Sequence, residues 1–551
     1  MRRIVPRGCR PILFFLAIAA HLSVVRGQSG VAPPVPPLAS ILQRPVPLRD
    51  GIGRANERVT TSSAQSQAFY NQGLAYLHSY VWIEAARSFN EALRHDANLA
   101  MAYVGLSEAL GELGLSAEAR DASAHAQKLA GAVTEREWLR VALRANQLDA
   151  AAHPDDGSRH TAYKQRLDEV LTKYPGDVEF LLLVGQAQDP STDGHGMGGG
   201  SSSLRFYERA LARSPEYFAV HHYMTHACEN INRIDRALVH AELYAAAAPA
   251  VPHAHHMYGH VLRRADRVED AIAEFETADR LERAYLQAEE IPVEYDWHYR
   301  HNLNLLGMSL QYAGRMTSAE PVLRRSFELR SLDRSAQDLN RKDWPTFLLA
   351  RGRADEALAA ARTLATDSTP LAAAMGHLLV SRALQSLNRP DAAAEEGDLA
   401  LGQMRAIGPQ GGSILPEFQL TQGEFLLRRG ELERARAMLR DAAAKLRGQS
   451  GPDAWVQTLF SLEQVTRVAR ELGDWSLAAE FARLMQSHDR TYAGTQYALG
   501  RASEHDGNRA AARRFYAEAL RGWARADRSL PEVFDTRRRL SALAATQPAH
   551  R

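Results

Sequence analysis

The chain has 551 residues, of which 45% are hydrophobic and 24% charged, and its formal net charge is +1. This composition excludes a disordered, collagen-like or disulfide-framework protein, and it argues against an overall basic nucleic-acid binder. The length indicates either several compact domains or one long array of repeats.

The N-terminus has the features of a secretory signal. Four arginines (Arg2, Arg3, Arg7 and Arg10) precede an apolar run over residues 11–25, which is shorter than the roughly 20 residues that span a bilayer. We expect residues 1–27 to be a signal peptide, with an uncleaved N-terminal anchor as the alternative. In both cases the body of the protein is exported, to the periplasm or the medium. Removal of the leader leaves 61 basic and 65 acidic residues, a charge of −4, and one cysteine, Cys228, so no internal disulfide can form.

A proline-rich stretch follows the leader. Six prolines lie between residues 28 and 50, and prolines at this density favour an extended, semi-rigid chain. We therefore interpret residues 28–65 as a linker. The alternative is that they contain a PxxP ligand for a partner protein.

A lattice of small and large residues recurs along the rest of the chain with a period near 34. It begins at Gly73, Tyr76, Ala85, Phe89 and Ala92, and its small first residue returns at Gly259, Gly423 and Gly500. These residues resemble the tetratricopeptide repeat (TPR) over about residues 66–543. The resemblance implies an all-α fold, a right-handed TPR superhelix (α-solenoid) of roughly eleven helix pairs, each burying its face against its neighbours.

The expected units fall into three groups. Residues 66–133 form N-terminal TPR units, residues 134–330 form central units, and residues 331–551 form C-terminal units and a tail. The stretch 134–175 lacks the lattice. Two interruptions occur in the central group: a Gly/Ser-rich insertion at residues 189–203, which lacks the Gly-Lys-Ser/Thr ending of a phosphate loop, and about 14 extra residues near residues 285–297.

Histidines are concentrated in the central units, where residues 221–260 hold eight of the 21 in the chain. His222 and His226 are four residues apart and share one face of a helix, and Glu229 continues that face. Adding the repeat period moves this histidine pair onto His256 and His260. The same side chains should therefore project from neighbouring first helices toward one side, which the resemblance implies is the concave, ligand-facing surface.

Imidazole nitrogens with one carboxylate suit Zn, Fe(II) or Cu. We expect a transition-metal site with the ligands His222, His226, Glu229, His256 and His260. A 2-His-1-carboxylate set of His222, His226 and Glu229 is one such arrangement. The HxxxH pattern is not the HExxH zincin signature, so protease chemistry is not supported. The alternatives are that the histidines line a polar peptide or small-molecule groove, or form a pH-sensitive surface.

Further residues border this cluster and are expected to bind a ligand: His253, Arg263, Arg264, His301 and Asn302. The arginines either orient an anionic ligand or pair with Glu229, Glu269 or Asp270. Cys228 lies off the histidine face, and we interpret it as a small buried hydrophobic residue.

The motifs HxxxHxxE at residues 222–229 and HxxxH at residues 256–260, followed by His301 and Asn302, resemble a subgroup of TPR proteins found in bacteria and animals. The match covers about residues 69–319. Most members of the subgroup have no assigned activity. Bacterial members often carry a further histidine where this chain has Asn304.

Two functional hypotheses follow. The preferred one is an exported TPR scaffold that binds a protein or peptide in its concave groove, with no nucleic-acid partner and no membrane span after signal cleavage. The alternative is a metal-binding TPR protein that carries Zn, Fe or Cu or uses it in catalysis, with Glu229 as a ligand or general base. The preference rests on how often repeat folds serve as binding scaffolds, and the sequence leaves enzyme activity open.

Overall fold

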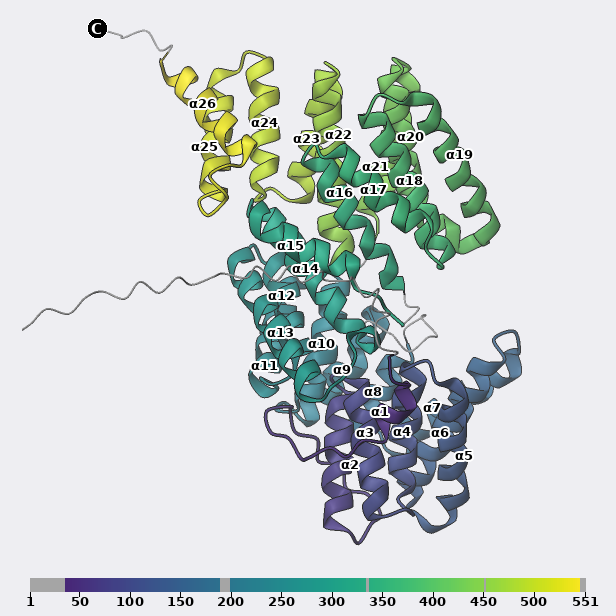
Figure 1. Ribbon diagram of the computed structural model, residues 1–551. Helices are drawn as coiled ribbons and strands as arrows, with labels where there is room; N and C mark the ends of the chain where they lie inside the picture. Colours follow the sequence, from purple (N-terminus) through teal and green to yellow (C-terminus); the bar gives the residue numbers. More distant parts are fainter. Residues whose placement is uncertain (1–34, 189–198, 333–335, 450–451, 546–551) are drawn as a thin grey trace, which may run out of the picture. The chain divides into compact units, whose positions relative to one another are not determined.

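The computed structural model describes residues 35–188, 199–332, 336–449 and 452–545. In these ranges the chain forms 26 α-helices, four short 3-10 helices and no strand (Figure 1). The predicted all-α fold is confirmed. The predicted signal peptide lies outside the described residues.

The N-terminal helices are α1 (Leu38–Leu42), α2 (Ala64–Leu77), α3 (Trp82–His95), α4 (Ala100–Glu112), α5 (Ser116–Leu129), α6 (Glu135–Ala152) and α7 (Gly157–Lys173). The central helices are α8 (Val178–Gln186), α9 (Ser201–Arg213), α10 (Phe218–Asn230), α11 (Ile234–Ala247), α12 (Pro252–Arg264), α13 (Val268–Ala288), α14 (Trp297–Tyr312) and α15 (Met316–Glu328).

The C-terminal helices are α16 (Asp343–Ala350), α17 (Ala354–Ala365), α18 (Pro370–Ser386), α19 (Pro390–Ile407), α20 (Leu415–Arg428), α21 (Leu432–Arg447), α22 (Pro452–Glu471), α23 (Trp475–His488), α24 (Ala493–His505), α25 (Arg509–Gly522) and α26 (Pro531–Ala545). The 3-10 helices are η1 (Ala130–Ala132), η2 (Val293–Tyr295), η3 (Ala336–Lys342) and η4 (Gly408–Ile414).

Helices that follow one another in the chain pack in pairs. The described residues contain twelve such pairs, from α2 with α3 to α24 with α25, and most pairs also contact the next pair along the chain. This is the predicted solenoid architecture, with one pair more than the roughly eleven expected. The stretch 134–175, which lacks the lattice, still supplies the pair α6 and α7.

The lattice residues explain the close packing inside a pair. Gly259 of α12 faces Phe275 of α13 so closely that a Cβ atom at residue 259 would lie 2.8 Å from the ring. Gly423 of α20 has the same relation to Leu439 of α21, at 2.6 Å. Since atoms this close would clash, these two pairs require a residue without a side chain opposite a large one.

The two interruptions have different outcomes. The extra residues of the second interruption lengthen α13 to 21 residues and form the turn that contains η2. Most of the Gly/Ser-rich insertion, residues 189–198, lies outside the described residues, but Ser201–Ser203 already belong to α9.

The proline-rich stretch is not a free linker over its described part, which corrects our interpretation. Ile41, Leu42 and Val46 are buried, and α1 packs against α3. The Arg87 guanidinium of α3 donates to the backbone oxygen of Pro45 at 2.8 Å. The stretch contains enough apolar side chains to gain free energy by covering the first helix pair, which proline content alone does not reveal.

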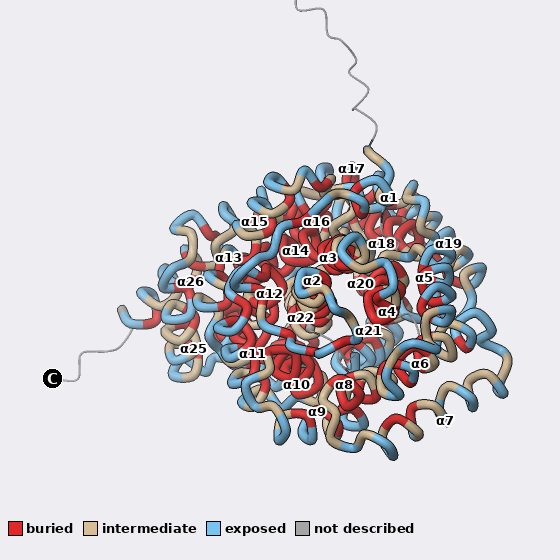
Figure 2. The backbone as a smooth tube through the Cα atoms, turned by 90° about the horizontal axis from the view of Figure 1, so that it is seen from below, coloured by how far each residue is buried: buried red, intermediate tan, exposed pale blue. Residues whose placement is uncertain are grey.

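Burial is uneven along the helices, as Figure 2 shows. In α10, twelve of the thirteen residues are buried, whereas α7 buries only two of its 17. The described apolar core has two large clusters and a smaller C-terminal one, and both α12 and α14 contribute to each of the two large clusters. The histidine-bearing helices therefore lie where the two clusters meet. None of the described helices is both long and apolar enough to cross a bilayer.

Candidate metal centre

Three first helices of consecutive pairs build the site. Helix α12 contacts both α10 and α14, so that the three present side chains to one another. Pro252 begins α12, where its missing N–H costs no hydrogen bond. The Asp296 carboxylate caps α14 by accepting from the backbone N–H groups of His298 and Tyr299. These ends fix the first turns, which carry His253 and His301.

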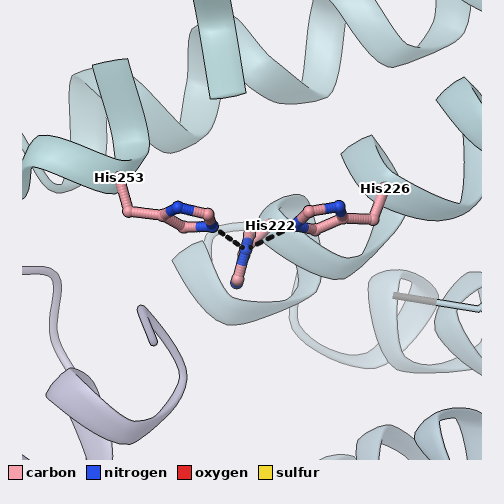
Figure 3. A group of neighbouring side chains, drawn as sticks. All are labelled: His222, His226 and His253. Carbon is pink, nitrogen blue, oxygen red and sulfur yellow. Dashed lines mark hydrogen bonds between the residues drawn. The ribbon is translucent and has the colours of Figure 1, made fainter. Parts of the chain in front are cut away.

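One group of three histidines converges between α10 and α12. Nitrogen atoms of His222, His226 and His253 all lie within 4.8 Å of one another. The Nε2 atom of His222 is 3.0 Å from Nε2 of His226 and 3.0 Å from Nε2 of His253 (Figure 3). We call these three residues the first trio.

The tautomer of His222 follows from its other nitrogen. Its Nδ1 atom is 2.6 Å from the backbone oxygen of His78, and because a carbonyl oxygen only accepts, Nδ1 carries the proton. The neutral ring then has a lone pair at Nε2, where two imidazoles approach. One lone pair accepts one good hydrogen bond, so hydrogen bonding alone does not satisfy this arrangement.

A second group of three histidines lies between α12 and α14. His256, His260 and His301 also have nitrogens within 4.8 Å of one another, and Nε2 of His260 is 2.9 Å from Nε2 of His256. The Nδ1 atom of His256 donates to the Asn302 side-chain oxygen at 3.0 Å, and the Asn302 amide donates in turn to the Phe275 backbone oxygen at 3.0 Å. His256 therefore also directs an Nε2 lone pair at its neighbour. We call these three histidines the second trio.

Two carboxylates stand behind the second trio. Oε1 of Glu229 is 3.6 Å from Nδ1 of His260, and Oδ2 of Asp453, on α22, is 3.7 Å from Nδ1 of His301. Metal-binding histidines commonly direct the second ring nitrogen at a carboxylate or a backbone oxygen, which orients the ring and makes the free nitrogen more basic. The backbone oxygen behind His222 follows this pattern, and His256 has the Asn302 amide oxygen in the same place, whereas Glu229 and Asp453 lie beyond hydrogen-bond distance of His260 and His301.

Burial keeps five of the six histidines neutral. All six rings are buried, with exposed fractions between 0% and 5%. Loss of hydration lowers the pKa of His226 and of His301 to about 4, and it lowers the pKa of His222, His253 and His256 well below the ordinary value. Neutral imidazole is the form that binds metal, and these five rings are in that form at neutral pH.

The carboxylates behind the second trio are ionised. Burial raises the pKa of the Glu229 carboxyl, but His260, Arg264 and His226 outweigh it and bring the pKa to about 2. For Asp453, burial is likewise outweighed by His301, His260 and Arg263, and the net pKa is lowered. The negative charge that a bound cation requires in this apolar surrounding is therefore present.

The spacing of the nitrogens fits a metal ion. Two nitrogens that share a tetrahedral ion at the usual Zn–N distance of about 2.0–2.1 Å lie roughly 3.3 Å apart. Three nitrogen pairs lie 2.9–3.0 Å apart and the others lie within 4.8 Å, so small shifts of the rings would bring each trio to the spacing of a bound ion. Each trio would leave one position of a tetrahedral ion open.

The structure divides the expected ligands differently from the sequence. His222 and His226 meet His253, which was expected only to border the site, and His256 and His260 meet His301. Glu229 does not join the first trio but lies beside the second. The expected 2-His-1-carboxylate set is therefore replaced by two all-histidine sets. The rings are also buried, whereas an open groove was expected.

The remaining expected residues take supporting positions. The guanidinium of Arg264 donates to the backbone oxygen of Glu229 at 3.0 Å, in agreement with the pairing alternative. Arg263 is fully buried, with its guanidinium over the Trp455 ring. Asn302 orients His256, Asn304 donates to Asp343 at 3.0 Å, and Cys228 is buried with a free thiol, as expected.

Three neighbours of the trios were not predicted from the sequence. His78 supplies the backbone oxygen behind His222, and Asp453 supplies the carboxylate near His301. His298 lies against both trios, with ring centroids 5.0 Å from His253 and 4.5 Å from His256, and its Nδ1 is 2.5 Å from Glu282. Its position three residues before His301 was the available signal for His298.

No protein-family model matches this chain, and no curated protein matches it. Similar solved structures include the human IFIT1 dimer with PPP-AAAA (13% identity, TM-score 0.39, 77% of this chain and 90% of that chain covered). Yeast Tom70 (11%, 0.30, 88% and 96%) and a tetratricopeptide repeat protein from Parabacteroides merdae (15%, 0.35, 51% and 99%) are others. These TM-scores are low, and the solenoid fold is established by the helix pairs themselves.

Proposed function

We propose that this protein binds two transition-metal ions, one in each histidine trio, on a frame of stacked helix pairs. The observation that carries the proposal is the convergence of three imidazole nitrogens in each trio. In each trio one ring, His222 or His256, donates from its second nitrogen to an oxygen and therefore directs an Nε2 lone pair at a neighbouring ring. A buried polar cluster of this size is costly unless its groups are satisfied, and a cation satisfies all the lone pairs at once.

The donor set favours Zn or Cu over Fe(II). Imidazole suits all three metals, but the usual open Fe(II) site includes a carboxylate ligand, and neither trio contains one. A zinc ion held by three histidines leaves a position for water, whose pKa it lowers toward neutrality. Glu229 lies near Nδ1 of His260, on the side of that ring away from Nε2, so its place is that of a group that supports the ligand ring.

Metal analysis of the untagged, full-length protein tests the proposal. The protein is stripped with a chelator, reloaded separately with Zn, Cu and Fe(II), dialysed, and analysed for bound metal. We expect about two equivalents of Zn or Cu, with nitrogen ligands at about 2.0 Å by X-ray absorption. His226→Asn and His260→Asn should each retain about one equivalent, since each removes a ligand from one trio.

A matched control is His377→Asn, which changes a half-buried histidine of α18 outside both trios and should leave the metal content unchanged. Less than about a tenth of an equivalent of every metal after reloading would refute the proposal.

A protein or peptide partner is the second proposal for the frame. A stack of helix pairs presents a long continuous surface of the kind that repeat proteins use for binding. Because the histidine rings are buried, such a partner would contact other side chains.

Export to the periplasm or medium is likewise proposed, from the leader alone. Mass spectrometry of the protein from its native host should find Gln28 as the first residue.

A further inference from the structure

A cavity of about 570 Å³ lies beside the second trio. The C-terminal ends of α10 and α12 form one side of it, and α21, α22 and the end of α23 form the other. A volume of this size is in the range of small-molecule sites. Glu229, the carboxylate partner of His260, is part of its wall.

Three arginines line the cavity: Arg264, Arg447 and Arg490. Arg264 is held by Glu229 and by the side-chain oxygen of Asn232. Arg447 and Arg490 are exposed, and no carboxylate of the described residues lies within ion-pair distance of either guanidinium. Two cations therefore stand at the wall of the cavity with their hydrogen-bond donors available.

The acidic residues of the wall are already engaged. Glu229 faces His260 and Arg264. Asp489 accepts from the Tyr312 hydroxyl at 2.8 Å and from the backbone N–H of Thr491 at 2.8 Å. Asp266 accepts from the Thr491 hydroxyl at 2.9 Å. Among the described residues, Arg447 and Arg490 are thus the positively charged groups of the wall that no side chain of opposite charge pairs with.

We propose that this cavity binds a small organic oxyanion, a carboxylate or a phosphate ester, with its head group between Arg447 and Arg490. The guanidinium fork matches the geometry of both oxyanions. Trp455, Leu446 and Ile234 provide an apolar wall against which the body of the ligand packs. The proposal does not require a metal ion, although the ligand would lie next to Glu229 and hence near the second trio.

Calorimetric titration of the metal-stripped, full-length protein at low ionic strength tests this site. The probes are phenyl phosphate, benzoate and inorganic phosphate, which separate the two head groups and the contribution of an apolar body. We expect phenyl phosphate or benzoate to bind with a Kd below about 1 mM and to bind more tightly than inorganic phosphate. The Arg447→Gln/Arg490→Gln double variant should bind at least about tenfold more weakly.

The matched control is Arg528→Gln, which changes an exposed arginine that does not line this cavity. Exposed Arg→Gln changes leave folding nearly unaffected, which circular dichroism confirms for each variant. The proposal is overturned if no probe binds up to about 10 mM, or if the double variant binds as well as the unchanged protein. A probe that binds only after metal reloading, and equally to the double variant, would overturn this site while supporting the metal centre.

Discussion

The central and C-terminal helix pairs share one packing scheme but differ at the histidine positions. Gly259 in α12 and Gly423 in α20 take the same place in the lattice, and Ser381 takes it in α18. Counted from that place, His256 and His260 correspond to Leu378 and Arg382 in α18 and to Leu420 and Glu424 in α20. There the charged residues pair across the helices, with Arg382 3.4 Å from Glu424. The fold therefore does not require histidine at these positions.

A second set of histidines occurs in both the central and the C-terminal helix pairs. His255 pairs with Glu274, and His377 pairs with Glu396, both at 2.6 Å and both 19 residues apart. The same two places in α10 and α11 hold His221 and His240, whose Nδ1 atoms are 3.0 Å apart. Because this contact occurs in both regions, we assign it to the packing of helix pairs, whereas the trios are special to the central region.

The largest expected effect is on metal affinity, when His256 and His260 are exchanged for the residues at the corresponding places of α18. In His256→Leu/His260→Arg, the second trio keeps one ligand, and we expect its metal affinity to fall by more than about 100-fold while the first trio stays loaded. Metal analysis would then find about one equivalent in place of two.

The control for this exchange is Leu378→Ala in α18. It should lower the free energy of unfolding by about 2–5 kcal/mol through the cavity it creates and leave the metal content unchanged. Retention of two tightly bound ions by the exchanged protein would contradict the trio assignment.

The His221 and His240 pair should make the central region sensitive to acid. Burial, followed by His221 and Arg236, lowers the pKa of His240 to about 4, below its ordinary value near 6.5. Between these values the unfolded chain binds a proton that the folded chain does not, so the free energy of unfolding falls as the pH falls. Allowing for screening near the surface, the loss between pH 7 and pH 5 is about 1–2 kcal/mol.

The His240→Glu variant sharpens this test, since it recreates the His–Glu pair found at His255 and His377. Urea unfolding of the metal-stripped proteins should show a smaller loss of stability at pH 5 in the variant. Equal losses in both proteins would show that the His221–His240 pair is not acid-sensitive, because the titrating groups outside this pair are shared and cancel in the difference.

The smallest effect is expected on the free energy of unfolding, when the His–Glu pairs common to both regions are removed. His255→Ala and His377→Ala should each lower the free energy of unfolding by about 0.5–1 kcal/mol, because the His–Glu contacts are partly exposed. Thermal unfolding measures this. If His255→Ala also released metal, its assignment to packing would be wrong.

Much of the fold could be predicted because the lattice is local. Gly259 and Phe275 are 16 residues apart, so one period of sequence contains the whole contact between the two helices of a pair. The contacts of His222 with His226, and of His256 with His260, follow from their spacing of four residues on one helix face. The two pairs were expected to share one site, and they belong instead to two separate trios.

The composition of each trio could not be predicted in this way. Glu229 follows His226 on one helix face, but one turn further along α10 that face meets His260 of the next helix. His253 has the small Ala219 as its equivalent in the preceding unit, while His301 takes the same place in the following unit, six residues before Gly307. The sequence placed both beside the site and not among the ligands. Asp453 reaches His301 only through the packing of α22 against the central helices, and no periodicity relates the two residues.

The contact of Asp453 with His301 bears on the order in which the protein matures. During synthesis all six histidines of the trios leave the ribosome well before α22 exists. A nascent chain could fold its central helices and still lack the carboxylate that orients His301. The second trio would thus bind an ion tightly only after the C-terminal third has been synthesised and folded.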